Sequence, residues 1–133
     1  MSAMAMSHLL RACGDVARAT PGLDILLLFG SRARGDASDQ SDWDFGFLGQ
    51  AEMDVAALIA AIVTAVGTDR VDLVDLERAS GLLRYRAARD GRTVFEAAPG
   101  AVDRFRLQAA DFWCDAGPAL QRDYDRLLAD LPA

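Results

Sequence analysis

The spacing of apolar and polar positions predicts helices and strands that alternate along the chain. Apolar residues recur at intervals of three and four over residues 6–17, which indicates an amphipathic helix that ends at 20–22. A second helical stripe covers residues 53–66 and is closed by Gly67. Between these helices, residues 23–29 form an apolar run broken only by Asp24, which is typical of a strand covered on both faces.

The second half of the chain predicts two more strands and two more helices. The sequence VDLVDL at 71–76 is expected to be a strand, and a small strand is expected at 93–96. A short helix is expected over 82–89, ended by Gly91. From about residue 100 to 131 the chain is expected to be helical with a break at 117–118, because proline cannot donate the amide hydrogen bond of a continuous helix.

Residues 42–48 alternate in a way that separates carboxylates from aromatic rings. Asp42 and Asp44 fall on one face of the predicted strand, and Trp43, Phe45 and Phe47 fall on the other. Two neighbouring carboxylates in a buried strand are unfavourable without a cation, and hard oxygen ligands at this spacing suit Mg²⁺. Turn hydrogen bonds are an alternative explanation for Asp42, but they do not explain an aspartate inside an aromatic strand.

Two further features leave alternatives open. Gly30 and Ser31 end a strand and open a predicted helix, where free backbone N–H groups favour a phosphate, although such a pair taken alone more often forms an ordinary turn. A third carboxylate would complete a two-metal site. Asp72 and Asp75 lie three residues apart and therefore on opposite faces of their strand, so only one of them can join the site.

Composition narrows the function classes. The chain has 133 residues, of which 52% are hydrophobic, enough for one domain with a single core. A net charge of −6 disfavours a long nucleic-acid backbone as the main partner. All 14 basic residues are arginine, and lysine and asparagine are absent, which excludes a P-loop and a protein-kinase catalytic loop.

Localisation is expected to be cytoplasmic. Cys13 and Cys114 are far apart and match no zinc or redox spacing, so both are expected to be reduced. The first residues lack a basic region followed by an apolar run, and no apolar stretch reaches about 18 residues. We therefore expect a soluble, non-exported protein with no membrane partner.

The motif GSRARGDASDQSDWD has Gly-Ser, ten residues and then Asp-x-Asp. It resembles the signature of the DNA polymerase β-like nucleotidyltransferase superfamily, especially its minimal (MNT) members. The segments RVDLVDL and SGLLRYRAARDGRTVFE also resemble MNT proteins encoded beside HEPN-domain toxins, as does the helical tail with FRLQAADFWCD. The resemblance covers roughly residues 8–131, and the tail is matched by its pattern rather than by fixed residues.

This resemblance implies a fold and a set of site residues. The fold would be an α/β (α+β) nucleotidyltransferase fold, with a small mixed sheet, flanking helices and a C-terminal helical tail, in one minimal domain over residues 1–133. Gly30 and Ser31 would hold nucleotide phosphates, and Asp42 and Asp44 would bind metal. The family's third carboxylate follows one apolar residue in the next strand, which selects Asp72 over Asp75 and makes it both a catalytic residue and a metal ligand.

Arg32 and Arg34 flank the motif loop. Guanidinium groups match phosphate geometry, so both are candidates for nucleotide binding. The alternative is that both are solvated charges beside Asp36 and Asp39.

A second basic cluster lies in the predicted helix over 82–89. Its arginines, Arg84, Arg86 and Arg89, surround Tyr85. The cluster either reaches a triphosphate or a protein partner, or forms one exposed helix face.

The implied activity is Mg²⁺-dependent transfer of AMP from ATP to a hydroxyl with release of pyrophosphate. Two Mg²⁺ ions would position and neutralise the phosphates while Asp72 helps to deprotonate the acceptor. MNT antitoxins modify a tyrosine of a HEPN ribonuclease toxin, so the resemblance implies an antitoxin with a HEPN toxin as its partner. The acidic charge is compatible with a basic partner.

Two alternative functions come from other classes. One is a binding antitoxin that occludes the HEPN toxin without catalysis. The other is a nucleotidyltransferase that modifies a small molecule such as an antibiotic, although such enzymes generally add a substrate-binding domain.

Overall fold

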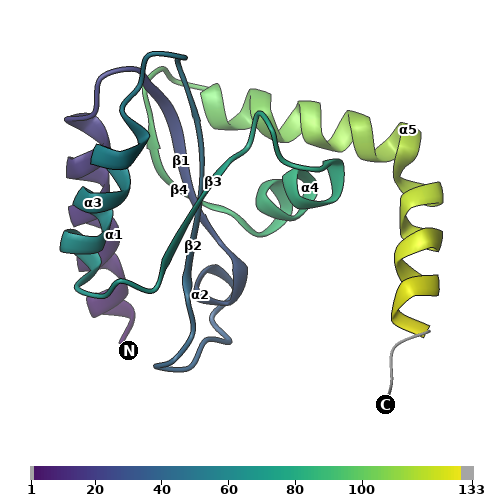
Figure 1. Cartoon of the computed structure of the whole chain (residues 1–133), viewed down its shortest axis with the longest axis horizontal. Helices are drawn as coiled ribbons and strands as arrows, with labels where there is room; N and C mark the ends of the chain where they lie inside the picture. Colours follow the sequence, from purple (N-terminus) through teal and green to yellow (C-terminus); the bar gives the residue numbers. More distant parts are fainter. Residues whose placement is uncertain (1, 130–133) are drawn as a thin grey trace.

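A computed structural model describes residues 2–129, without the side chains of 113–121, 123, 124, 127 and 128. Figure 1 shows a central sheet with helices on either side. The elements in chain order are α1 (Ala3–Arg18), β1 (Leu23–Phe29), α2 (Gly30–Arg34), β2 (Trp43–Gly49), α3 (Val55–Val66), β3 (Val71–Asp75), α4 (Gly81–Asp90), β4 (Arg92–Glu96) and α5 (Ala101–Ala129).

The sheet has four strands in the order β3-β2-β1-β4. β1 pairs antiparallel with both β2 and β4, whereas β2 and β3 pair in parallel. The parallel pair requires a crossover, and α3 provides it. The small mixed sheet expected from the sequence is therefore confirmed.

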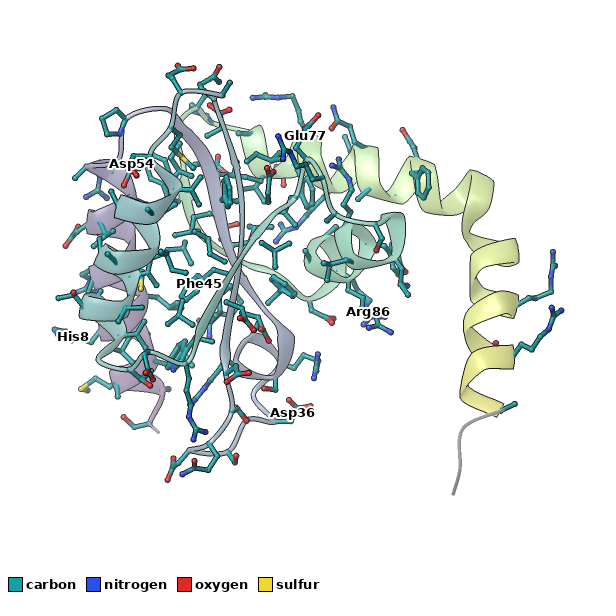
Figure 2. The ribbon with its side chains drawn as sticks, in the orientation of Figure 1. His8, Asp36, Phe45, Asp54, Glu77 and Arg86 are labelled. Atoms are coloured by element: carbon teal, nitrogen blue, oxygen red, sulfur yellow. The ribbon has the colours of Figure 1, made fainter. Side chains whose placement is uncertain are left out.

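Helices cover both faces of the sheet, and each face has its own core (Figure 1). On one face α1 and α3 pack over a cluster that includes Trp43, Phe45, Phe47, Leu26 and Leu28. Figure 2 shows Phe45 between the sheet and this helical layer. On the other face, α4 and α5 pack over a second cluster, formed by Ile25, Leu27, Phe29, Leu76, Ala87, Val102 and Phe105. β1 supplies residues to both clusters, which explains its continuous apolar sequence.

Side-chain caps explain where the helices begin. The side chain of Ser2 accepts a hydrogen bond from the Ala5 amide at the start of α1, and Asp54 accepts one from Ala57 at the start of α3. The cap at Asp54 makes α3 begin later than the apolar stripe suggests. Met53, which the stripe includes, precedes the helix and is nevertheless buried in the first core.

The expected break at Gly117–Pro118 is wrong as an interruption of the C-terminal helix. α5 continues as one helix from Ala101 to Ala129, and Figure 1 shows that it bends sharply partway along. Proline removes one hydrogen bond and its ring crowds the preceding turn, which can kink a helix without ending it.

Among the described residues, the helices do not include one that is both long and apolar enough to cross a membrane.

A substitution of Phe45 tests the core that packs against β2. Its side chain is fully buried and stacks against Trp43 with ring centroids 6.5 Å apart. We expect Phe45→Ala to lower the free energy of unfolding by about 3–5 kcal/mol, as measured by urea denaturation. The control Leu107→Ala changes a side chain that is 65% exposed, and we expect less than about 0.5 kcal/mol. Equal effects of the two substitutions would contradict this description of the core.

Candidate active site

The end of β1 brings the motif loop directly against an aspartate of β2. Phe29, the last residue of β1, is in register with Asp44. The next residue, Gly30, has a φ of 71°, and a Cβ atom there would collide with the Asp44 carboxylate oxygen Oδ2. Only glycine combines this left-handed backbone with so close an approach. The Gly-Ser half of the motif and its Asp-x-Asp half are therefore adjacent in space.

The register of the parallel strands decides which aspartate of β3 lies near Asp44. Asp72 is the partner of Asp44, whereas Asp75 is the partner of Phe47. Because side chains alternate along a strand, Asp72 and Asp44 share the face that α4 and α5 cover, and Asp75 lies on the other face. Asp75 instead accepts a hydrogen bond from the Glu77 amide at 3.0 Å.

The environment of Asp44 disfavours its negative charge. Burial raises the pKa of Asp44, and the negative charges of Asp72 and Asp42 raise this pKa further, while Arg34 lowers it. Asp42 itself is exposed and lies one residue before β2. Burial and like charge both disfavour ionisation, so a cation near Asp44 would relieve a real electrostatic cost.

The donor set fits a hard divalent cation by its chemistry. Carboxylate oxygens of Asp42, Asp44 and Asp72 are the ligand type that Mg²⁺ prefers, and Mg²⁺ commonly takes its other ligands from substrate phosphates and water. Among the side chains that the structure describes, no three from Asp, Glu, His or Cys converge closely enough to enclose a metal by themselves. The three aspartates thus supply an open, partial ligand set rather than a closed protein cage.

A cleft of about 330 Å³ opens beside Asp44. Its lining comes from two sides, with Phe29, Gly30, Ser31, Arg34 and Asp44 from the β1–α2 and β2 side and Leu83, Arg86 and Asp90 from α4. This volume is within the range of small-molecule sites. Of the predicted site residues, Gly30, Ser31, Arg34 and Asp44 line the cleft, whereas Asp42, Asp72 and Arg32 do not.

The sequence indicated only part of the contribution of α4 to this cleft. It placed Arg86 in a basic cluster that either reaches a triphosphate or a protein partner or forms an exposed helix face, and it did not single out Leu83 and Asp90 as site residues. Their positions, three and four residues apart in succession, place all three on one face of a helix. That spacing could have grouped them, but the sequence could not reveal which part of the molecule this face would meet.

Arg34 bridges the two sides of the cleft. Its Nε lies 3.3 Å from Oδ2 of Asp36 in the motif loop, and its Nη1 lies 3.7 Å from Oδ2 of Asp90 in α4. Asp90 also accepts hydrogen bonds from Arg89 at 2.9 Å, which lower the pKa of Asp90. An ionised Asp90 therefore holds one end of the Arg34 guanidinium at the cleft.

Arg32 has a different place. It is only 8% exposed, its guanidinium lies 4.5 Å from the centre of the Trp43 ring, and its Nη2 donates a hydrogen bond to the Ser41 carbonyl at 2.9 Å. Arg32 is thus neither a solvated charge nor a lining residue of the cleft. It fastens the motif loop to the aromatic side of β2 just before the aspartates.

Comparison with known proteins agrees with this geometry. The family model described as polymerase beta, nucleotidyltransferase matches residues 13–99. The protein adenylyltransferase MntA of Aphanizomenon flos-aquae (strain 2012/KM1/D3) is 34% identical over 98 residues. This match covers 65% of the present chain and 65% of that protein, slightly less than two thirds of each.

Two solved structures of similar fold come from toxin–antitoxin systems. A toxin–antitoxin structure with AMP-PNP contains a chain that is 25% identical, with a TM-score of 0.69, and the match covers 86% of this protein and 94% of that chain. A complex of an MNT antitoxin with the tri-AMPylated HEPN toxin of Shewanella oneidensis shares the fold at 22% identity, with a TM-score of 0.68 and coverage of 92% and 98%. The family match spans the motif loop, all three aspartates and α4, and the chain belongs to the polymerase beta nucleotidyltransferase family.

Proposed function

We propose that this protein transfers AMP from ATP to a tyrosine hydroxyl of a HEPN-domain ribonuclease toxin and thereby acts as an antitoxin. The observation that carries the proposal is the meeting of the Gly30–Ser31 turn with Asp44 and, through the strand register, with Asp72. The adenylyltransferase name of the relative that is 34% identical supports AMP as the transferred group. The AMP-PNP bound in the structure that is 25% identical supports ATP as the donor.

The proposed transfer is a nucleophilic displacement at the α-phosphorus of ATP. A bond forms between the acceptor oxygen and this phosphorus, and the bond to the bridging oxygen of the β-phosphate breaks, so that pyrophosphate leaves. Asp72 takes up the proton of the attacking hydroxyl as the new bond forms. Gly30 and Ser31 hold the phosphates by their backbone N–H groups, and Arg34 adds a positive charge from the side of the cleft.

Asp42, Asp44 and Asp72 would hold Mg²⁺, with two ions as the expected number. The metal would supply charge neutralisation of the phosphates and would lower the pKa of the acceptor hydroxyl. Arg32 keeps a supporting part in this proposal, because it fixes the loop that leads to Asp42 and Asp44.

We place the protein in the cytoplasm together with its toxin, and an acidic net charge of −6 suits a basic ribonuclease partner.

The chemistry is tested by the mass of the partner. We expect the neighbouring reading frame to encode a HEPN protein, and we expect that protein to gain the mass of one or more AMP units when it is incubated with this protein, ATP and Mg²⁺. Intact-protein mass spectrometry measures the gain, and replacement of the acceptor tyrosine by phenylalanine should abolish it. If the mass of the HEPN protein stays unchanged and AMP is transferred to an aminoglycoside, the acceptor substrate is an antibiotic and not the toxin.

Substitution of both aspartates of the motif separates catalysis from occlusion. For Asp42→Ala combined with Asp44→Ala we expect AMP transfer to fall by roughly 100-fold or more, because the metal ligands are lost. Cells that produce the toxin should lose protection. Protection that persists with an unmodified toxin would show that binding alone neutralises the toxin.

A single substitution controls for damage to the fold in that experiment. Burial and like charge raise the pKa of Asp44, so its ionised form destabilises the folded state at neutral pH. Asp44→Asn should therefore keep or raise the thermal unfolding temperature in the presence of EDTA while it lowers AMP transfer. If the unfolding temperature of Asp44→Asn falls, the loss of activity is explained by damage to the fold.

Asp72 and Asp75 provide a matched pair within one strand. Asp72→Asn and Asp75→Asn remove the same charge, but only Asp72 lies beside Asp44. We expect AMP transfer to fall by roughly 100-fold for Asp72→Asn and by less than about threefold for Asp75→Asn. Steady-state rates of pyrophosphate release provide the measurement. The opposite order would assign the third carboxylate to Asp75 and contradict the register argument.

A further inference from the structure

The cleft has a second wall, which is formed by one face of α4. Leu83, Arg86 and Asp90 line it opposite the Gly30–Ser31 turn. Figure 2 shows Arg86 extending from the side of α4 on which α2 and the loop with Asp36 also lie. Arg86 is half-buried, so part of its side chain is already ordered against the protein.

Neighbouring elements hold this wall in place. Arg106 of α5 donates hydrogen bonds to the carbonyls of Ala88 at 3.2 Å and Gly91 at 2.7 Å, which satisfies the C-terminal end of α4. Arg84 donates to the Leu76 carbonyl at the end of β3, and its guanidinium lies 5.4 Å from the centre of the Phe105 ring. Arg84 and Arg106 are thus engaged in joining α4 to β3 and α5, and neither lines the cleft.

The charge of the cleft poses a problem for a nucleotide. A triphosphate carries several negative charges and would lie beside Asp44 and Asp90. The chain contains no lysine, so each fixed side-chain cation near neutral pH is an arginine. Among the lining residues the arginines are Arg34, which contacts Asp36 and Asp90, and Arg86, which comes from α4.

We propose that Arg86 binds the polyphosphate of the donor nucleotide from the α4 wall, opposite the Gly30–Ser31 turn. This inference rests on the proposed function and adds a residue to its substrate site. A guanidinium pairs with phosphate oxygens through two parallel hydrogen bonds, whereas a neutral adenosine or tyrosine offers it no such charged partner. Arg86 therefore acts on the phosphate part of the donor and not on its base or on the acceptor.

Nucleotide binding by the intact chain tests this role without reference to catalysis. Isothermal titration calorimetry with Mg²⁺ measures the dissociation constants of ATP and of adenosine for Arg86→Gln. We expect the ATP constant to rise by roughly 10- to 100-fold, as for the loss of a charge-assisted contact, and the adenosine constant to stay within about twofold. Arg86→Lys should recover only part of the ATP affinity, because lysine keeps the charge but lacks the planar fork.

Arg18→Gln is the matched control. It makes the same change in charge on α1, on the opposite side of the sheet, at a side chain that is 71% exposed. We expect it to bind ATP as the wild-type protein does. An equal loss of ATP affinity in Arg18→Gln and Arg86→Gln would show that the loss depends only on net charge, and it would overturn the proposal.

The remaining outcomes separate this inference from the proposed function. If the wild-type protein binds ATP and Arg86→Gln binds it equally well, the role of Arg86 is overturned and the proposed function stands. If Arg86→Gln weakens ATP and adenosine to the same extent, Arg86 shapes the cleft and does not bind phosphate. If the wild-type protein binds no ATP, both proposals fail together. Should Arg86→Gln not fold, unchanged ATP affinity in folded Arg86→Lys overturns the inference.

Discussion

The parallel pairing of β2 with β3 is the constraint around which the site is organised. It places Asp72 beside Asp44 on one face of the sheet, where like charge and burial together oppose the ionisation of Asp44. A sheet tolerates such a pair only if it is otherwise strongly stabilised. Here Phe45 of β2 and Leu76, which directly follows β3, are fully buried in the cores on the two faces. The chemistry is confined to the end of the sheet, beyond these apolar layers.

Arginine performs several distinct tasks in a chain without lysine. Arg32 is buried against Trp43 and supports the motif loop, and Arg106 satisfies the end of α4. Arg34 reaches from the loop to Asp90 across the cleft. These tasks use the planar, multiply donating guanidinium, which an ammonium group reproduces poorly. The arginines around the site therefore divide into those that hold its walls and those that line it.

Much of the fold could be predicted because local pattern and tertiary environment agree. The alternation over residues 42–48 predicted that Trp43, Phe45 and Phe47 share one face, and these three rings lie in the same core, while Asp42 precedes β2. Prediction failed where a neighbour in space decided the outcome. The expectation that Arg32 is a solvated charge is wrong, because its side chain is buried with the guanidinium over the Trp43 ring. The bend in α5 likewise replaced an expected break, because a long helix can retain its remaining hydrogen bonds around a proline.

The sequence by itself determined the strand-to-helix turn at Gly30, the position of Asp44 on the face opposite Trp43 and Phe45, and the opposite faces of Asp72 and Asp75. These properties follow from backbone periodicity and from the conformational freedom of glycine, which act over a few residues. Only the tertiary structure decided that Asp72 is the neighbour of Asp44 and that α4 forms the second wall of the cleft. Strand register and helix docking depend on contacts between segments far apart in the chain, and no local pattern specifies them.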